Sequence, residues 1–129
     1  MIPWLPALLR LEAYGDNWQI YVEAVYSAFR DDFVQDRPIF KGRRVGLKRH
    51  PLSQGKEATF WHLVSEGADE ATRTPDIRRC ERIRWPRALI DNESDDAVRI
   101  WANQRNNERR ILLFIEEEYY LVVLADRKS

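Results

Sequence analysis

The stretch KGRRVGLKRHPLSQGKEATFWHLVSEG spans residues 41–67 and holds both histidines of the chain, His50 and His62. Within it, Ala58 to Val64 is rich in β-branched and aromatic side chains, which predicts a strand. Alternation along that strand would place His62 on the same face as Phe60. The residues just before, Ile39 to Lys48, predict a first strand, in which two glycines permit a bend or a bulge. The fold is therefore expected to be built around a sheet that starts here.

The residues on the N-terminal side predict a helix and a packed arm. From Trp18 to Phe33, apolar side chains recur at intervals of three and four, which is typical of an amphipathic helix. Gly15-Asp16 provides a turn and a cap at its start, and Pro38 stops it. Residues 1–15 are expected to form an extended arm that packs on the body through Trp4, Leu5, Leu8, Leu9 and Leu11.

The C-terminal half predicts a second short helix and several strands. Thr74-Pro75-Asp76 combines a cap, a proline and an acid, so a helix is expected from Pro75 to about Ile83, ended by Pro86. A brief strand is expected at 87–90, and another begins at 98–101. Two apolar runs, Arg109 to Ile115 and Tyr119 to Leu124, are separated by three glutamates, which indicates a hairpin.

This order of elements contains no βαβ repeat. The predicted fold is α+β: an N-terminal amphipathic helix packed on a mostly antiparallel sheet of about four to five strands, with a second short helix. At 129 residues the chain is expected to form a single domain, 1–129.

The charges balance, with 21 basic and 21 acidic residues, so no global field attracts the protein to nucleic acid. Basic residues nevertheless gather at 41–49 and 78–87, while acidic residues gather at 66–70, 91–96 and 116–118. These clusters are open to two interpretations. They form a local basic face for a nucleic acid, or they pair with one another on the surface.

Composition and motifs exclude several classes of protein. No apolar run reaches the length of a membrane span, and no cleavable signal is recognisable, so a cytoplasmic location is expected. The single Cys80 is expected to be a buried structural thiol, although neighbouring arginines offer a way to activate it. Nucleotide-binding loops and metal-ligand spacings are missing from the sequence, so no metal and no cofactor is expected.

Both histidines stand beside other groups of chemical interest. His50 lies in Lys48-Arg49-His50-Pro51, and His62 follows two aromatic residues, so acid/base groups lie near phosphate-binding cations. Each histidine is open to a plainer interpretation. His62 fits a core or edge residue with a satisfied hydrogen bond, and His50 fits a solvated loop residue.

Four segments carry a resemblance: GRRVGLKRHP at 42–51, GKEATFWH at 55–62, PDIRRCERIRWPR at 75–87 and ERRILLF at 108–114. They resemble a small bacterial family described as phage-related, which is associated with the barnase, EndoU, colicin and RelE-like (BECR) ribonuclease fold. The resemblance spans nearly the whole chain, from Trp4 to Lys128.

The resemblance implies metal-independent cleavage of RNA, often by a toxin that a cognate antitoxin silences. Such a reaction needs a base, an acid and cations around the phosphate. His62 is the candidate base or acid and His50 the complementary group, with Lys48 as a third catalytic candidate because RelE-like members use basic residues instead. Arg49, Arg84 and Arg87 are candidates for phosphate binding. Trp61 and Trp85 are candidates for stacking an unpaired base, or else they fill the core.

One departure from the family supports an alternative. An aromatic strand follows the position of Arg127-Lys128 in the family, whereas this sequence stops at Ser129. The alternative is a non-catalytic module of the same fold that binds a protein or a nucleic acid. An open sheet edge at Tyr119 to Leu124 would then be expected to recruit a second copy or an antitoxin.

Overall fold

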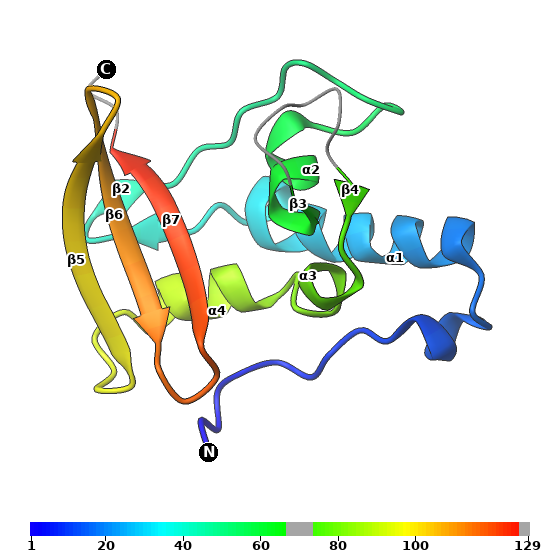
Figure 1. The fold of residues 1–129 in the computed structure, drawn as a ribbon, viewed down its shortest axis with the longest axis horizontal. Helices are drawn as coiled ribbons and strands as arrows, with labels where there is room; N and C mark the ends of the chain where they lie inside the picture. The colour runs from blue at the N-terminus through cyan, green and yellow to red at the C-terminus, as the bar shows by residue number, and fades with distance from the viewer. Residues whose placement is uncertain (67–73, 127–129) are drawn as a thin grey trace.

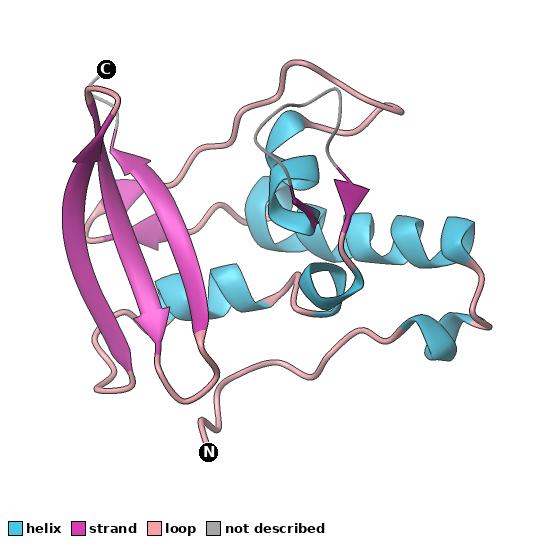
Figure 2. Ribbon diagram, in the orientation of Figure 1, coloured by secondary structure: helices cyan, strands magenta, loops and turns pink. Residues whose placement is uncertain are grey.

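The computed structural model describes residues 1–66 and 74–126. It joins a group of helices to a three-stranded antiparallel sheet, which stands at one side of the molecule (Figure 1). Helices and strands alternate in no regular order (Figure 2). The predicted α+β class is therefore confirmed.

The N-terminal arm and the first helix follow the prediction closely. The arm ends in the short helix η1 (Leu11–Tyr14), and its five apolar residues all pack against the core. Helix α1 (Trp18–Arg30) continues into the wider turn η2 (Asp31–Gln35). The cap is Asn17, one residue later than expected, and its side chain accepts a hydrogen bond from the Ile20 N–H at 3.1 Å.

The first predicted strand is shorter than expected. Strand β1 (Ile39–Phe40) pairs with β2 (Arg43–Arg44) across a two-residue turn. Both turn residues have positive φ, 48° at Lys41 and 81° at Gly42, which is the geometry of a type I′ hairpin. Gly42 thus provides a tight turn and not the bulge of a longer strand.

The predicted strand at 58–64 is wrong, because these residues form helix α2 (Ala58–Val64). The fully buried side chains are Phe60 and Val64, four residues apart and therefore on one side of a helix. Tertiary packing of these two residues outweighs the strand preference of their neighbours. The next residues form β3 (Ser65–Glu66), which pairs with β4 (Thr74–Pro75). Apart from Glu66, the acidic cluster at 66–70 lies outside the described residues.

The expected helix at 75–83 is present but shorter, whereas the strand expected at 87–90 is wrong because a further helix stands there. Asp76, not Thr74, caps α3 (Ile77–Glu81), where its carboxylate accepts a hydrogen bond from the Arg78 N–H at 2.9 Å. Helix α4 (Trp85–Asp91) begins with Pro86 in its first turn. Proline is tolerated there because the first N–H groups of a helix have no partner within it. Pro86 therefore starts a helix instead of ending one.

The sheet consists of β5 (Val98–Arg105), β6 (Glu108–Ile115) and β7 (Tyr120–Asp126), in the order β5-β6-β7. The predicted hairpin is thus confirmed, whereas the expected four to five strands in one sheet are corrected to three. The four other described strands form two separate pairs. One face of the sheet joins the helices in a common core, which includes Phe29, Phe60, Leu89, Val98, Leu113, Ile115 and Val122.

Candidate functional site

Backbone hydrogen bonds hold the Lys48–His50 segment against the first turn of α2. The Ala58 N–H donates to the Arg49 carbonyl and the Thr59 N–H donates to the Lys48 carbonyl, both at 3.0 Å. The Lys48 N–H donates to the Thr59 hydroxyl oxygen at 2.6 Å. Because backbone groups make these contacts, the side chains of residues 48–50 remain exposed. We refer to this segment together with His62 as the α2 surface.

The other histidine belongs to the same helix. His62 is exposed and follows Thr59 by three residues, which places their Cβ atoms roughly 5–6 Å apart on one side of α2. Thr59 is the residue that contacts Lys48 through its hydroxyl group. The structure therefore places His62 about one helical turn from the contact between Thr59 and Lys48, on a helix and not on a strand.

A buried carboxylate, that of Glu57, lies at the start of this turn. Glu57 precedes α2, is 6% exposed and accepts a hydrogen bond from the Tyr26 hydroxyl at 2.7 Å. Burial and this hydrogen bond raise the pKa of Tyr26. Arg49 Nη1 lies 3.9 Å from Glu57 Oε2, so the buried carboxylate attracts the guanidinium of the exposed Arg49 side chain. Neither Glu57 nor Tyr26 was among the residues singled out from the sequence, because a lone glutamate before a supposed strand gives no signal.

Trp61 and the loop before α2 form the other side of this turn. The Trp61 indole N–H donates to the Ser53 carbonyl at 2.9 Å, and its ring meets Phe60 edge to face. Lys56 is buried, with its ammonium 2.5 Å from Glu23 and 5.1 Å from the Tyr26 ring centroid. Trp61 is half-buried and therefore both anchors the loop and presents part of its ring beside the α2 surface.

Arg84 lies elsewhere and pairs with acids. Its guanidinium is 3.2 Å from Asp32 and 3.5 Å from Asp31, at the end of the first helix. Burial raises the pKa of Asp32, against the lowering effect of the neighbouring arginines. A hollow of about 260 Å³ opens here, lined by Trp4, Pro6, Asp32, Arg84, Arg87, Ala88, Asp91 and Asn92. Its cations face carboxylates of the same hollow.

Arg87 closes the C-terminal end of η2. Its guanidinium donates to both carboxylate oxygens of Asp91 at 2.9 and 3.0 Å, to the Asp32 carbonyl at 2.7 Å and to the Asp36 carbonyl. Burial lowers the pKa of Arg87, but the hydrogen bond to Asp91 outweighs it and the pKa is raised. These bonds occupy the fork that a phosphate would need, so Arg87 has a structural task.

Trp85 and Cys80 are core residues. Trp85 is 5% exposed, its indole N–H donates to the Pro6 carbonyl at 2.9 Å, and its ring meets Tyr120 edge to face. It presents no face on which an unpaired base can stack. Cys80 is fully buried, and burial raises the pKa of its thiol to about 12. The expectation of a structural thiol is confirmed.

No family model matches this chain, and no match to it was found among curated proteins or solved structures. Among the described helices, none is long and apolar enough to cross a membrane. Within residues 1–66 and 74–126, no three His, Cys, Asp or Glu residues gather in a way that could hold a metal ion. With no related protein to compare, the geometry of the α2 surface is the basis for a functional proposal.

Proposed function

We propose that the protein is a metal-independent endoribonuclease, of the kind found in toxins of phage or mobile-element origin, that acts in a cytoplasm at the α2 surface. The observation that supports this is the set of three hydrogen bonds between the Lys48–His50 segment and the first turn of α2. They hold Lys48, Arg49 and His50, whose side chains are exposed, against α2, the helix that also carries the exposed His62. An acid, a base and phosphate-binding groups are what cleavage of RNA by its own 2′-hydroxyl requires.

In this reaction one histidine removes the proton from the 2′-hydroxyl, and the freed oxygen attacks the adjacent phosphorus. The bond from phosphorus to the 5′-oxygen breaks, and the other histidine donates a proton to that oxygen. A 2′,3′-cyclic phosphate and a 5′-hydroxyl result. Lys48 and Arg49 stabilise the charge that gathers on the phosphate oxygens, and Trp61 offers a ring edge for a neighbouring base.

Glu57 has a positioning role in this proposal. It is buried and bonded to Tyr26, so its place is fixed, and it attracts the guanidinium of Arg49 from 3.9 Å. Arg49 itself is largely exposed and would otherwise sample many rotamers. The carboxylate thus restrains the cation near the N-terminal end of α2.

The test is incubation of labelled single-stranded RNA with the protein in excess chelator. We expect cleavage, and His62→Ala is expected to slow the chemical step roughly 100-fold or more. Gln19→Ala serves as the control, because Gln19 is an exposed residue of α1 outside this surface. With two histidines as acid and base, the rate should fall on both sides of a maximum between about pH 5 and 8.

Two outcomes would redirect the proposal. A full rate in His62→Ala would reject the histidine assignment, and a rate that keeps rising well above pH 8 would move the chemistry to Lys48. RNA that is retained but never cleaved would support the alternative, a non-catalytic module that binds a nucleic acid or a protein with the same basic segment. That alternative gains from the finding that Arg84, Arg87 and Trp85 are engaged within the fold.

The expected partner at the sheet edge stays a prediction. Within the described residues, β7 pairs with β6 and forms an edge of the sheet, close to the expected range of 119–124. An antitoxin segment or a second copy could add a strand there by backbone hydrogen bonds. Protection of the β7 amides from hydrogen exchange on mixing with the partner would reveal such pairing.

A further inference from the structure

The sheet has a second face, which points away from the helices. Side chains alternate between the two faces along each strand. Trp101, Leu112 and Val123 are in register with one another, so they share this outer face. None of these three belongs to the main hydrophobic cluster between the sheet and the helices. In Figure 1 the described helices all lie beyond the other side of the sheet. We call this surface the outer face.

The outer face is apolar in its middle. Trp101 is 44% exposed, Leu121 46% and Val123 42%, whereas Leu112, between Trp101 and Val123 in the sheet, is covered by its neighbours and only 5% exposed. Phe114 contacts the ring of Trp101 edge to face, with centroids 6.3 Å apart. Contiguous apolar patches of this kind on a folded protein usually mark a binding surface.

Tyr119 extends the patch at a conformational cost. It is 87% exposed, and its φ of 53° lies in the left-handed region, which a bulky side chain rarely adopts. Its ring packs edge to face on Phe114 at 5.7 Å. A large exposed aromatic held in a strained backbone conformation is typical of a residue that serves a contact.

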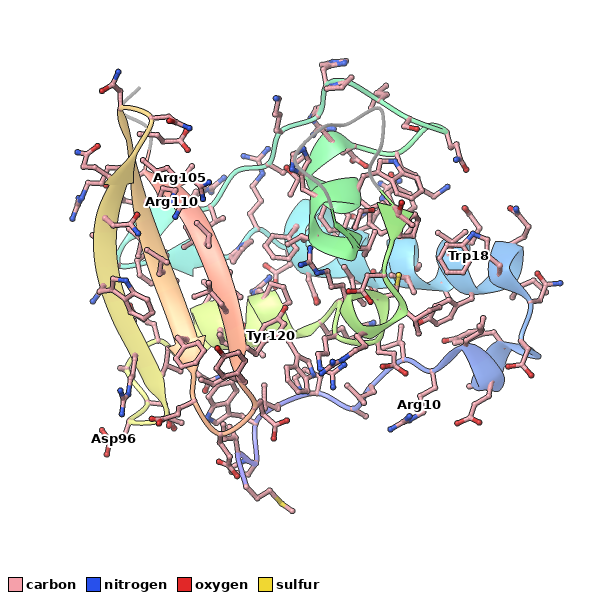
Figure 3. The ribbon with its side chains drawn as sticks, in the orientation of Figure 1. Arg10, Trp18, Asp96, Arg105, Arg110 and Tyr120 are labelled. Atoms are coloured by element: carbon pink, nitrogen blue, oxygen red, sulfur yellow. The ribbon has the colours of Figure 1, made fainter. Side chains whose placement is uncertain are left out.

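The two ends of the outer face carry opposite charge. Arg105 and Arg110 stand at one end of the sheet, where they outnumber Glu108, the register partner of Arg105, and Asp96 lies at the other end (Figure 3). The acidic end also holds the turn of Glu116, Glu117 and Glu118, in which Glu116 lies 2.8 Å from Arg99 and Glu117 lies 2.5 Å from the N-terminal ammonium of Met1. The face is therefore a dipole along the strands, with an apolar centre.

We infer that the outer face binds a second copy of this chain, in a two-fold dimer whose strands run antiparallel across the interface. Rotation about an axis perpendicular to the strands places the basic end of each copy over the acidic end of the other. The exposed side chains of Trp101 and Val123 then meet their own copies near the centre. A surface that is complementary to itself in this way needs no other partner.

The charges favour a second copy over RNA. Three glutamates stand beside Tyr119 and Phe114, the aromatic rings on which a base would otherwise stack, and they repel phosphate. Arg99 is already paired with one of them. Two aliphatic side chains, Leu121 and Val123, also face outward, where they gain more from another apolar surface than from a nucleotide.

The size of the face sets the strength of the contact. Eight-residue strands at about 3.3 Å per residue, three strands wide at about 4.8 Å each, give a face on the order of 400 Å². This is below the roughly 800 Å² per partner of a standard interface. The dimer is therefore expected to be reversible, with a dissociation constant on the order of 10–100 µM and a clear dependence on salt.

Sedimentation equilibrium over micromolar to near-millimolar concentrations tests this. The wild type should pass from one to two chain masses, and added salt should weaken the association. Val123→Lys should raise the dissociation constant tenfold or more. Ile20→Lys is the matched control, since Ile20 is an apolar residue of α1 that is 56% exposed, and it should dimerise as the wild type does. Circular dichroism and thermal melting of both variants check that they fold.

A charge exchange tests the antiparallel arrangement. One variant carries Arg105→Glu and Arg110→Glu, and the other carries Glu117→Lys and Glu118→Lys. Each variant alone should remain a monomer, because both contacts of its dimer repel. A mixture of the two should form a heterodimer, because both contacts then attract.

Three results would overturn the inference. The first is a mass of one chain at every concentration. The second is a wild-type dimer that Val123→Lys leaves unchanged or that salt strengthens. The third is a dimer unaffected by Arg105→Glu, because Arg105 lies on β5, at the opposite side of the sheet from the β7 edge. Loss of RNA retention in Val123→Lys without a change in mass would assign the face to nucleic acid instead.

Discussion

At the scale of single residues, the salt dependence of RNA binding distinguishes the role of Arg49 from that of the buried Glu57 beside it. Arg49→Ala should weaken RNA binding and lower the slope of log affinity against log salt by about one, because one phosphate contact is lost. Glu57→Gln keeps the hydrogen-bond partner of Tyr26 but removes the charge that restrains Arg49. It should weaken binding without changing the slope, because the cation is still present.

Fluorescence titrations at three or more salt concentrations measure both quantities. The informative control is Arg78→Ala, which removes an exposed cation of α3 outside the α2 surface and should leave the slope as it is. An unchanged slope in Arg49→Ala would remove Arg49 from the RNA contact.

The thiol of Cys80 should be inert in the folded protein. It is fully buried and its pKa is raised to about 12, so almost no thiolate exists at neutral pH. We expect an aromatic disulfide reagent to leave the native protein unmodified and to label one thiol per chain in denaturant. Rapid labelling of the native protein would show that the region around α3 opens readily.

At the scale of elements, Arg87 should matter for stability. It bonds carbonyls at the end of η2 and the carboxylate of Asp91 at once, which joins η2 to α4. Arg87→Ala should lower the free energy of unfolding by about 2 kcal/mol, a typical value for hydrogen bonds to charged groups. Arg87→Lys should recover little of it, because an ammonium lacks the planar fork.

Urea unfolding provides the measurement. Arg78→Ala is a suitable control, because the side chain of Arg78 is exposed on α3. A loss in Arg87→Ala no greater than that of the control would assign the network a negligible role.

The helices and strands that could be predicted are those whose own pattern of apolar residues is long enough to specify the secondary structure. The apolar period of α1 is long enough to specify a helix, and the two runs around the glutamates specify the β6–β7 hairpin. Helix α2 could not be predicted, because seven residues are too few for a period to outweigh β-branched and aromatic preferences. The burial of Phe60 and Val64 by distant parts of the chain makes it a helix.

The candidate site was predictable in its exposed cations and histidines and not in its buried parts. The basic run before His50 can be seen in the sequence. The pairing of Arg84 with Asp32, or of Glu57 with Tyr26, joins residues 52 and 31 positions apart, and only the fold brings them together. The sequence alone therefore shows where the cations of this chain are, but not which of them are paired with acidic residues in the fold.

At the scale of the whole molecule, Asp126 ties the small hairpin to the sheet. Its carboxylate accepts hydrogen bonds from Arg43 of β2 at 2.6 Å and from Arg109 of β6 at 2.8 Å. The hydrogen bond from Arg43 lowers the pKa of Asp126, with a contribution from Arg109. The stabilisation is therefore present above the unfolded pKa of about 3.9 and is lost as pH falls through the lower folded value.

Asp126→Asn tests this. Urea unfolding at pH 7 should show a less stable variant, and the difference from the wild type should shrink as the pH approaches 3 and below. A difference that stays constant over this range would mean that the charge of Asp126 does not contribute to it.

The N-terminal arm also fixes an order of events during synthesis. Its Trp4 indole bonds Asp95, 91 residues further along, and the Leu9 N–H bonds the Glu81 carbonyl. At about 5–20 residues per second, a ribosome makes these partners on the order of ten seconds after the arm. The apolar residues made first must therefore wait, exposed, until the helices that cover them have emerged. Chaperones that bind short apolar segments near the ribosomal exit have their clearest target in this protein there.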